Sequence, residues 1–421
     1  MLRTRAVVVP GLTCAAAQDV HTTAATNSRT IAVSGTVLVP AMSWRGPGPR
    51  PVLSYGVGVH GLGRDSAPSH LLATGLEGEL AFLELALSRG WSVVVTDGEG
   101  LGLPGPHTYG AGRVGGRAML DIVRAAVAGV DGVEVGAPVL LWGYSEGGRC
   151  AAWAAEHQPI YARELTLVAL AAGGVPTDLA AVVEAIDGGP YSGLGLAVLV
   201  GLAHAHEDPR LWDILNARGR AAAAVAATLD VTGLVVSHPE PMAAWTTRER
   251  PWEDPLWAAL LRAERNPGGT PEVPVYLYHA KGDDIVPAEL SRQLATAYEA
   301  MDVHVTHVEL DSGDHLTGAV DGADAAITWL AEQLDAHLDL HRDPLAGPDA
   351  ADERVPGMSW CRSGRASTRA GVRGRRMGAQ VLEGPPRTLG WGTSRSWRPC
   401  GADNPVAVGP SRVVPWKGAD S

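Results

Sequence analysis

Residues 139–148 read Val-Leu-Leu-Trp-Gly-Tyr-Ser-Glu-Gly-Gly, a short apolar run that leads into a Gly-x-Ser-x-Gly motif. The apolar run predicts a buried strand, and the Ala-rich segment after it predicts a helix. Glycines on both sides of a serine allow a sharp turn from strand to helix, which pushes the serine hydroxyl out of the turn. The motif therefore predicts that Ser145 is a nucleophile. The alternative is a Gly-rich connection that holds an incidental serine.

Strand-like and helix-like segments alternate on both sides of this motif. Strands are predicted at residues 31–40, 51–60, 91–96, 139–142, 165–171, 274–279 and 303–310, and helices at residues 77–88, 117–130, 147–157, 289–301 and 323–337. Such alternation is typical of a mostly parallel sheet with helices on both faces. Together with the serine turn, it predicts an α/β-hydrolase fold.

Composition divides the chain into four parts. Residues 30–340 carry the alternating pattern, but residues 174–269 within them are Ala-rich and helical, which predicts a helical cap inserted into the hydrolase domain. Residues 1–29 are expected to be an N-terminal extension or a weak signal-like segment. Residues 341–421 are rich in Gly, Arg, Pro and Ser without periodicity, which predicts a disordered tail.

The overall composition excludes several classes of protein. Hydrophobic residues make up 46% of the chain and charged residues 19%, which suits a globular core. No uninterrupted apolar run approaches the length of a membrane span, about 20 residues. A net charge of −12 provides no electrostatic footprint for nucleic acid. The four cysteines lack metal-binding spacing. No metal and no organic cofactor is implied by the motifs of the chain.

A serine nucleophile needs a base and an orienting carboxylate, which this fold supplies in the order Ser, Asp, His. Asp283 and Asp284 directly follow a predicted strand, and the Asp-x-x-Val-Pro pattern selects Asp283. Asp284 is the alternative. His315 follows the last predicted strand in a turn, whereas His304 and His307 lie within the strand pattern. The sequence therefore predicts a triad of Ser145, Asp283 and His315.

These motifs together resemble the secretory lipases, the lipase-A type of α/β-hydrolase. The likeness is carried by residues 34–40, 67–69, 97–102, 112–113, 116–118, 143–148, 279–287 and 315–317, and it extends over residues 31–340. Members of the family often have a cysteine directly before Ala-Pro-Ser. This chain has Ser66 there, so the disulfide of that cysteine is absent.

The resemblance implies an oxyanion hole formed by Asp97 and the backbone N–H of Glu146. An ionised carboxylate cannot donate a hydrogen bond, so Asp97 would have to be protonated, which burial favours. The alternative is that Asp97 is a carboxylate that caps the Gly-rich turn after it. The loop at His60 and Gly61 is a further possible source of donors.

The cap indicates the substrate class. Residues 194–202 are densely apolar, and the resemblance implies a cap that encloses an acyl chain. Tyr144, Leu196 and Leu199 are the predicted substrate contacts, with ordinary core packing as the alternative for each. We therefore expect a serine carboxylic-ester hydrolase, a lipase or esterase, that acts on acylglycerols or other acyl esters and can contact a lipid–water interface.

Other functions share the same residues. An acyltransferase or a peptidase would use the same triad, and a non-catalytic binding protein could use the same scaffold. The N-terminal pattern and the resemblance favour a secreted or cell-envelope protein, with a cytoplasmic location as the alternative.

Overall fold

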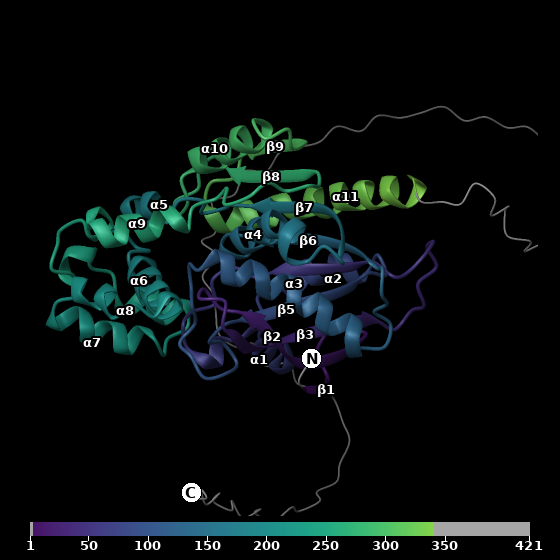
Figure 1. Cartoon of the computed structure of the whole chain (residues 1–421), viewed down its shortest axis with the longest axis horizontal. Coiled ribbons are helices and arrows are strands. Elements are labelled where there is room, and N and C mark those ends of the chain that lie inside the picture. The colour runs from purple at the N-terminus through teal and green to yellow at the C-terminus, as the bar shows by residue number, and fades with distance from the viewer. Residues whose placement is uncertain (1–2, 341–421) are drawn as a thin grey trace, which may run out of the picture. The chain divides into compact units, whose positions relative to one another are not determined.

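A mostly parallel sheet of nine strands organises residues 3–340, the part of the chain that the computed structural model describes (Figure 1). The strands are β1 (Arg3–Val7), β2 (Cys14–Ala24), β3 (Thr30–Pro40), β4 (Val52–Gly56), β5 (Ser92–Gly98), β6 (Pro138–Tyr144), β7 (Thr166–Gly173), β8 (Val275–Ala280) and β9 (Val305–Leu310). Their order in the sheet is β1-β2-β3-β5-β4-β6-β7-β8-β9. Neighbouring strands from β5 to β9 are parallel, whereas β1, β2 and β3 are antiparallel to their neighbours. The predicted fold class is confirmed.

Helices cover both faces of the sheet. They are α1 (Pro68–Thr74), α2 (Leu80–Leu87), α3 (Gly112–Gly129), α4 (Glu146–Tyr161), α10 (Ala288–Glu299) and α11 (His315–Leu340). One apolar core joins α1, α2 and α11 to the sheet, and others join α3, α4 and α10 to the opposite face. Since both faces are covered, β4, β6 and β8 are buried along their whole lengths, as the apolar runs in their sequences predict.

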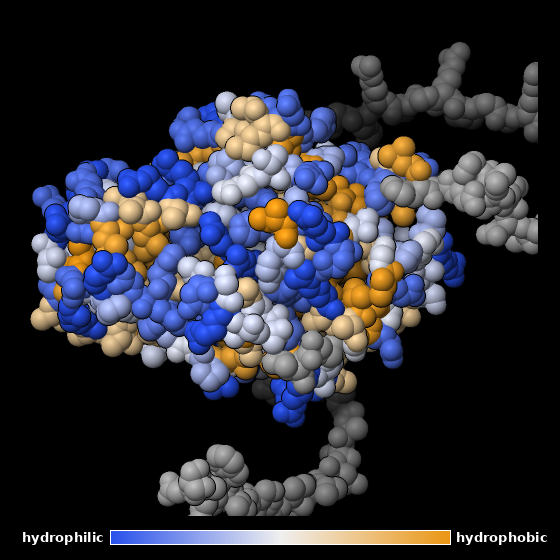
Figure 2. Space-filling view, viewed as in Figure 1, coloured by the Kyte–Doolittle hydropathy of each residue, from blue (hydrophilic) through white to orange (hydrophobic). Residues whose placement is uncertain are grey.

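A group of helices between β7 and β8 forms the cap, at the left of Figure 1. It comprises α5 (Leu179–Ile186), α6 (Gly193–His206), α7 (Ala217–Ala226), α8 (Val231–Ser237) and α9 (Pro255–Ala263), with short 3-10 turns between them. Helix α6 is buried along almost its whole length, because the other cap helices pack around it in a separate apolar core. The space-filling view in Figure 2 shows hydrophobic residues gathered over the cap within a largely hydrophilic face.

The N-terminal region differs from the expectation that residues 1–29 lie outside the hydrolase domain. Strands β1 and β2 belong to the same sheet, and β2 pairs with β3 along its whole length, from Cys14 opposite Pro40 to Ala24 opposite Thr30. The first half of β2, residues 14–19, holds no β-branched residue, and the β-branched character that marks a strand is confined to Val20, Thr22 and Thr23. Pairing with β3, not local preference, accounts for this strand.

Two other expectations concern the C-terminal tail and membrane-spanning segments. The predicted disordered tail, residues 341–421, lies outside the described residues. Within residues 3–340, no helix has both the length and the apolar character needed to cross a membrane.

The pairing of β2 with β3 predicts a stability difference between two truncations. Deleting residues 1–27 removes β2 and leaves β3 with an unpaired edge, so we expect aggregation or an apparent Tm lower by roughly 10 °C or more. Deleting only residues 1–8 removes the exposed strand β1 and should lower the Tm much less. Thermal denaturation of both proteins tests this. Equal Tm values for the long truncation and the full chain would contradict the role of β2.

Candidate active site

Ser145 stands at the sharp turn between β6 and α4, as the motif predicts. Its backbone has φ 56° and ψ −125°, a strained conformation for a residue with a side chain. The turn packs tightly on the end of β4, because a Cβ at Gly147 would overlap the carbonyl oxygen of Gly56. The Ser145 N–H donates to the carbonyl of Gly173 at 2.8 Å, which fixes the turn against β7.

The N-terminus of α4 lies directly after the serine. Glu146 is the first residue of this helix, so its backbone N–H has no intrahelical acceptor. The Glu146 side chain is buried, and one of its oxygens accepts a hydrogen bond from Gly110 N–H at 3.2 Å. The backbone N–H of Glu146 is therefore free to donate a hydrogen bond to a negative charge that develops near Ser145.

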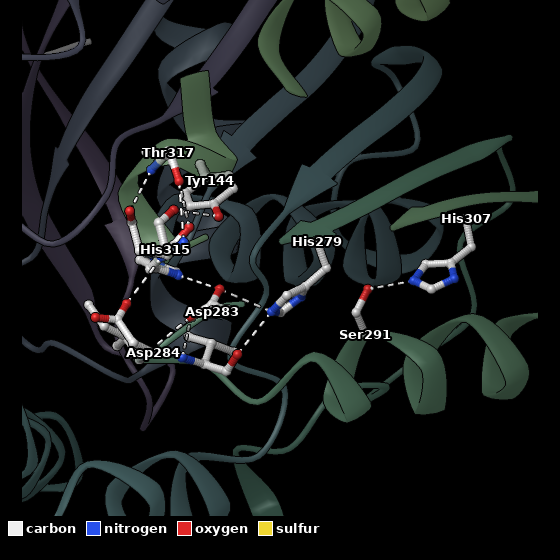
Figure 3. Close-up of polar contacts among 11 residues, drawn as sticks. Tyr144, His279, Asp283, Asp284, Ser291, His307, His315 and Thr317 are labelled. Carbon is white, nitrogen blue, oxygen red and sulfur yellow. Dashed lines mark hydrogen bonds and ion pairs between the residues drawn. The ribbon is translucent and has the colours of Figure 1, made fainter. Parts of the chain in front are cut away.

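Asp283, in the loop after β8, and His315, the first residue of α11, are brought into contact. The Nδ1 atom of His315 lies 2.6 Å from Oδ2 of Asp283 (Figure 3). The other Asp283 oxygen accepts hydrogen bonds from the backbone N–H groups of Ile285 at 3.0 Å and Val286 at 2.7 Å. Burial alone would raise the pKa of Asp283, but hydrogen bonds from His279 and His315 overcome this and hold it well below its usual range. Asp283 is thus an ionised carboxylate facing an imidazole.

Asp284, the alternative carboxylate, has a different contact. Its Oδ1 accepts a hydrogen bond from the backbone N–H of His315 at 3.1 Å, not from the imidazole ring. The ring contact therefore favours Asp283 over Asp284 as the partner of the His315 side chain.

The His315 ring lies beside the serine turn. It packs against the ring of Tyr144 with centroids 5.0 Å apart, and the Tyr144 hydroxyl donates to the His315 carbonyl at 2.8 Å. A Cβ at Gly174 would come within 3.0 Å of His315 Cε1, and Gly174 follows the residue that accepts from Ser145 N–H. His315 Nε2 is buried and bonds to none of the described residues, and no hydrogen bond joins it to the Ser145 hydroxyl.

Asp97 lies at the end of β5, and its hydrogen bonds join it to two serines and not to the triad candidates. Its Oδ1 accepts from Ser69 N–H at 2.7 Å, and its Oδ2 accepts from the hydroxyls of Ser34 at 2.5 Å and Ser69 at 2.6 Å. Burial raises the pKa of Asp97 despite these hydrogen bonds. Because Ser69 is in the first turn of α1, Asp97 caps that helix and not the Gly-rich turn after β5.

The loop at His60 and Gly61 is attached to the cap. The N–H groups of Leu62 and Gly63 both donate to the carbonyl of Leu229, each at 2.9 Å. These donors are therefore occupied in this arrangement. The His60 side chain is held by Glu77 at 3.0 Å. Burial alone would lower the pKa of His60, but the hydrogen bond and charge of Glu77 raise it to about 9.

The three predicted substrate contacts occupy different places. Tyr144 is buried and supports His315 from behind, as described above. Leu196 is fully buried in the cap core. Leu199 lines an apolar cavity of about 30 Å³ together with Val198 and Trp257. This cavity is far too small for an acyl chain, so such a chain could enter only if the cap moved.

A larger cavity of about 520 Å³ lies at the β1–β2 side of the sheet. Arg3, Arg5 and Arg64 line it, together with the two serines that hold Asp97. No triad candidate lines this cavity, so the chemistry predicted for Ser145 is not located there. Within residues 3–340, no cluster of three or more His, Cys, Asp or Glu side chains is arranged to hold a metal ion.

Comparison with known proteins assigns the family. The profile of the secretory lipases matches residues 66–243 and 254–340, more than half of the chain. The chain belongs to the secretory lipase family.

The curated relatives of this secretory lipase family member are fungal lipases. Lipase 6 of Candida albicans is 30% identical over 286 residues, which cover 63% of this chain and 59% of Lipase 6. A secreted triacylglycerol lipase of Malassezia furfur is 27% identical over 276 residues, which cover 61% of this chain and 70% of that lipase. The chain thus spans less than two thirds of the length of Lipase 6.

Solved structures confirm the fold of this secretory lipase family member. Candida antarctica lipase A is 25% identical, with a TM-score of 0.73 and coverage of 80% of this chain and 81% of lipase A. A rice cell wall degrading esterase from Xanthomonas oryzae is 18% identical, with a TM-score of 0.64 and coverage of 81% and 98%. At that lower identity, the likeness concerns the fold alone.

Some residues of the site are not singled out by the sequence pattern. Ser34 and Ser69 hold Asp97, and His279 contacts Asp283. All three lie in segments that carry the family resemblance, which is the signal that could have marked them. His307, which the sequence places within a strand, shares a hydrogen bond with the Ser291 hydroxyl at 3.0 Å, away from His315 and Asp283 (Figure 3).

The tight packing of the serine turn predicts the effect of one methyl group. Gly147→Ala places a Cβ against the Gly56 backbone, so we expect a loss of about 3 kcal/mol or more in the free energy of unfolding. Gly78→Ala is a matched control, because a Cβ there meets no atom within 4 Å, and its effect should stay within about 0.5 kcal/mol. Denaturant unfolding measures both. Similar stabilities for the two variants would contradict the packing described for the turn.

Proposed function

We propose that the chain is a serine carboxylic-ester hydrolase in which Ser145 is the nucleophile, His315 the general base and Asp283 the carboxylate that orients His315. The observation that carries the proposal is the 2.6 Å contact between His315 Nδ1 and Asp283 Oδ2, directly beside the serine turn. An imidazole that donates from Nδ1 to a carboxylate presents Nε2 as an acceptor, which is the state a general base requires. Family membership adds independent support, since the matched relatives are lipases.

The reaction would proceed through an acyl-enzyme. His315 Nε2 accepts the hydroxyl proton of Ser145 while the serine oxygen attacks the ester carbonyl, and the alcohol leaves with that proton. Water then attacks the acyl-enzyme by the same proton route and releases the carboxylic acid. The Ser145 hydroxyl and His315 must approach each other on substrate binding, and such hydrogen bonds are often long in a free enzyme.

Two donors are proposed for the negative charge that develops on the ester oxygen. The backbone N–H of Glu146, at the start of α4, is the first. Asp97 is the second, in its protonated form, which the raised pKa of this buried carboxyl supports. In the structure Asp97 Oδ2 accepts hydrogen bonds from the Ser34 and Ser69 hydroxyls, so to act in this way Asp97 would have to take up a proton and donate that O–H group to the ester oxygen.

The substrate class follows from the cap. Acylglycerols or other acyl esters are proposed as substrates, with the acyl chain between the cap helices at Leu199 after the cap opens. Leu196 would support this cavity from the cap core, and Tyr144 would position His315. Hydrophobic residues exposed on cap helices α7 and α8, Val225 and Val236, suit contact with a lipid–water interface. Membership of the secretory lipase family supports secretion of the protein.

Replacing the proposed nucleophile tests this function directly. Ser145→Ala should lower the turnover of p-nitrophenyl butyrate by about 10⁴-fold or more, because no other group can form the acyl-enzyme. It should also abolish labelling by a fluorophosphonate probe. Ser43→Ala, at an exposed serine, is the control and should leave both unchanged. Turnover or labelling that survives in Ser145→Ala would overturn the assignment.

A further inference from the structure

A second imidazole reaches the carboxylate of Asp283. His279 Nε2 lies 3.1 Å from Asp283 Oδ2, the same oxygen that contacts His315 (Figure 3). His279 is the next-to-last residue of β8, and both side chains are fully buried. Asp283 Oδ2 therefore stands between two histidines, one on each side.

The surroundings of His279 determine which of its nitrogens carries a proton. Its Nε2 faces two acceptors, Asp283 Oδ2 and the carbonyl oxygen of Val286 at 2.9 Å. Its Nδ1 is buried and has no hydrogen-bond partner among the described residues. A proton on Nδ1 would leave a buried donor without an acceptor and would turn a lone pair toward the carboxylate. The proton therefore belongs on Nε2, where the two acceptors share it.

We propose that His279 is a positioning residue of the proposed ester hydrolase, which holds Asp283 from behind and sets the basicity of His315. The Nε2–H group of His279 fixes Oδ2 of Asp283 in the orientation that meets His315 Nδ1. The same donor also bonds to Val286, so it closes the turn that carries Asp283. This role rests on the proposed function, because it acts through the triad that the function requires.

The effect on His315 follows from the charge on the shared oxygen. Each hydrogen bond donated to a carboxylate disperses its negative charge, and a less concentrated charge stabilises a neighbouring imidazolium less. Removal of the His279 donor should therefore leave more negative charge on Asp283 Oδ2, beside the His315 ring. It should also loosen the Asp283 side chain, because Oδ2 would lose one of its two imidazole partners. Only His315 on Oδ2 and two backbone N–H groups on Oδ1 would then hold the carboxylate.

Other ionisable groups surround Asp283 and His315 and also influence His315. They are Asp284 on the same turn, Asp314 before α11, Tyr144 at the end of β6, Tyr191 in the cap and His307 on β9. They remain unchanged when only His279 is replaced. A shift in the titration of the base in such a variant is therefore attributable to the lost donor.

The experiment compares three variants in the pH dependence of kcat/KM for p-nitrophenyl butyrate. His279→Phe keeps a ring but removes the donor, whereas His279→Gln places an amide N–H close to the position of Nε2. His304→Gln replaces an exposed histidine and serves as the control. The acid limb of kcat/KM reports the pKa of the base in the free enzyme.

For His279→Phe we expect the acid limb to move to higher pH by roughly half a unit or more. We also expect kcat to fall about tenfold while KM stays within about twofold, because a loosened Asp283 misorients the base. His279→Gln should recover part of this loss, and its acid limb should lie nearer to that of the parent. A His279→Phe protein that folds and retains the parent's acid limb and kcat would overturn the proposal.

A second measurement uses the intact protein and does not depend on the folding of a variant. Nitrogen-15 NMR of the ring should show His279 protonated at Nε2, and protonation at Nδ1 would overturn the proposal. Failure of the proposed function has a different signature, since the parent protein would then lack turnover that depends on Ser145. The NMR result would still decide whether His279 carries its proton on Nε2, the nitrogen that faces Asp283.

Discussion

The close approach of two backbones, at Gly56 on β4 and Gly147 on α4, is the constraint on which the site depends. Neither position has room for a side chain, because a Cβ on either glycine would overlap the backbone of the other. This contact lets α4 begin directly over the end of β6 and forces Ser145 into a strained turn. The serine is therefore held at the carboxyl edge of the sheet, where the loops that follow the other parallel strands also gather.

The other two triad candidates meet because β8 and β9 end at the same level. Ala280 pairs with Leu310 at the ends of these parallel strands, and Lys281 N–H then donates to the Leu310 carbonyl at 2.9 Å. Gly282 continues the contact with a hydrogen bond to the Ser312 carbonyl at 3.1 Å. The two loops thus leave the sheet side by side. Asp283 and His315, far apart in the chain, face each other as a consequence.

Much of the fold could be predicted from the sequence, since β6, β7 and β8 are short apolar runs that a covered parallel sheet requires. Strand β2 and helix α1 could not be predicted locally. Strand β2 is specified by its partner β3, and the seven residues of α1 are too few to display a helical period.

The candidate site was predictable only in part, for a related reason. The loop positions after β6, β8 and β9 follow from the order of residues in this fold, so Ser145, Asp283 and His315 could be selected. The hydrogen bonds of Asp97 and His279 could not, because each joins side chains whose contact depends on the packed loops. The sequence pattern favoured Asp283 but kept Asp284 as the alternative, and the contact with the His315 ring favours Asp283.

A crystal structure of the protein after reaction with an alkyl p-nitrophenyl phosphonate would test the convergence of these loops most directly. The phosphorus should be bonded to Ser145 Oγ, with His315 Nε2 within hydrogen-bond distance of that oxygen and a phosphoryl oxygen on the Glu146 N–H. An unmodified Ser145, or a modified serine from which the His315 ring is turned away, would contradict the site described here.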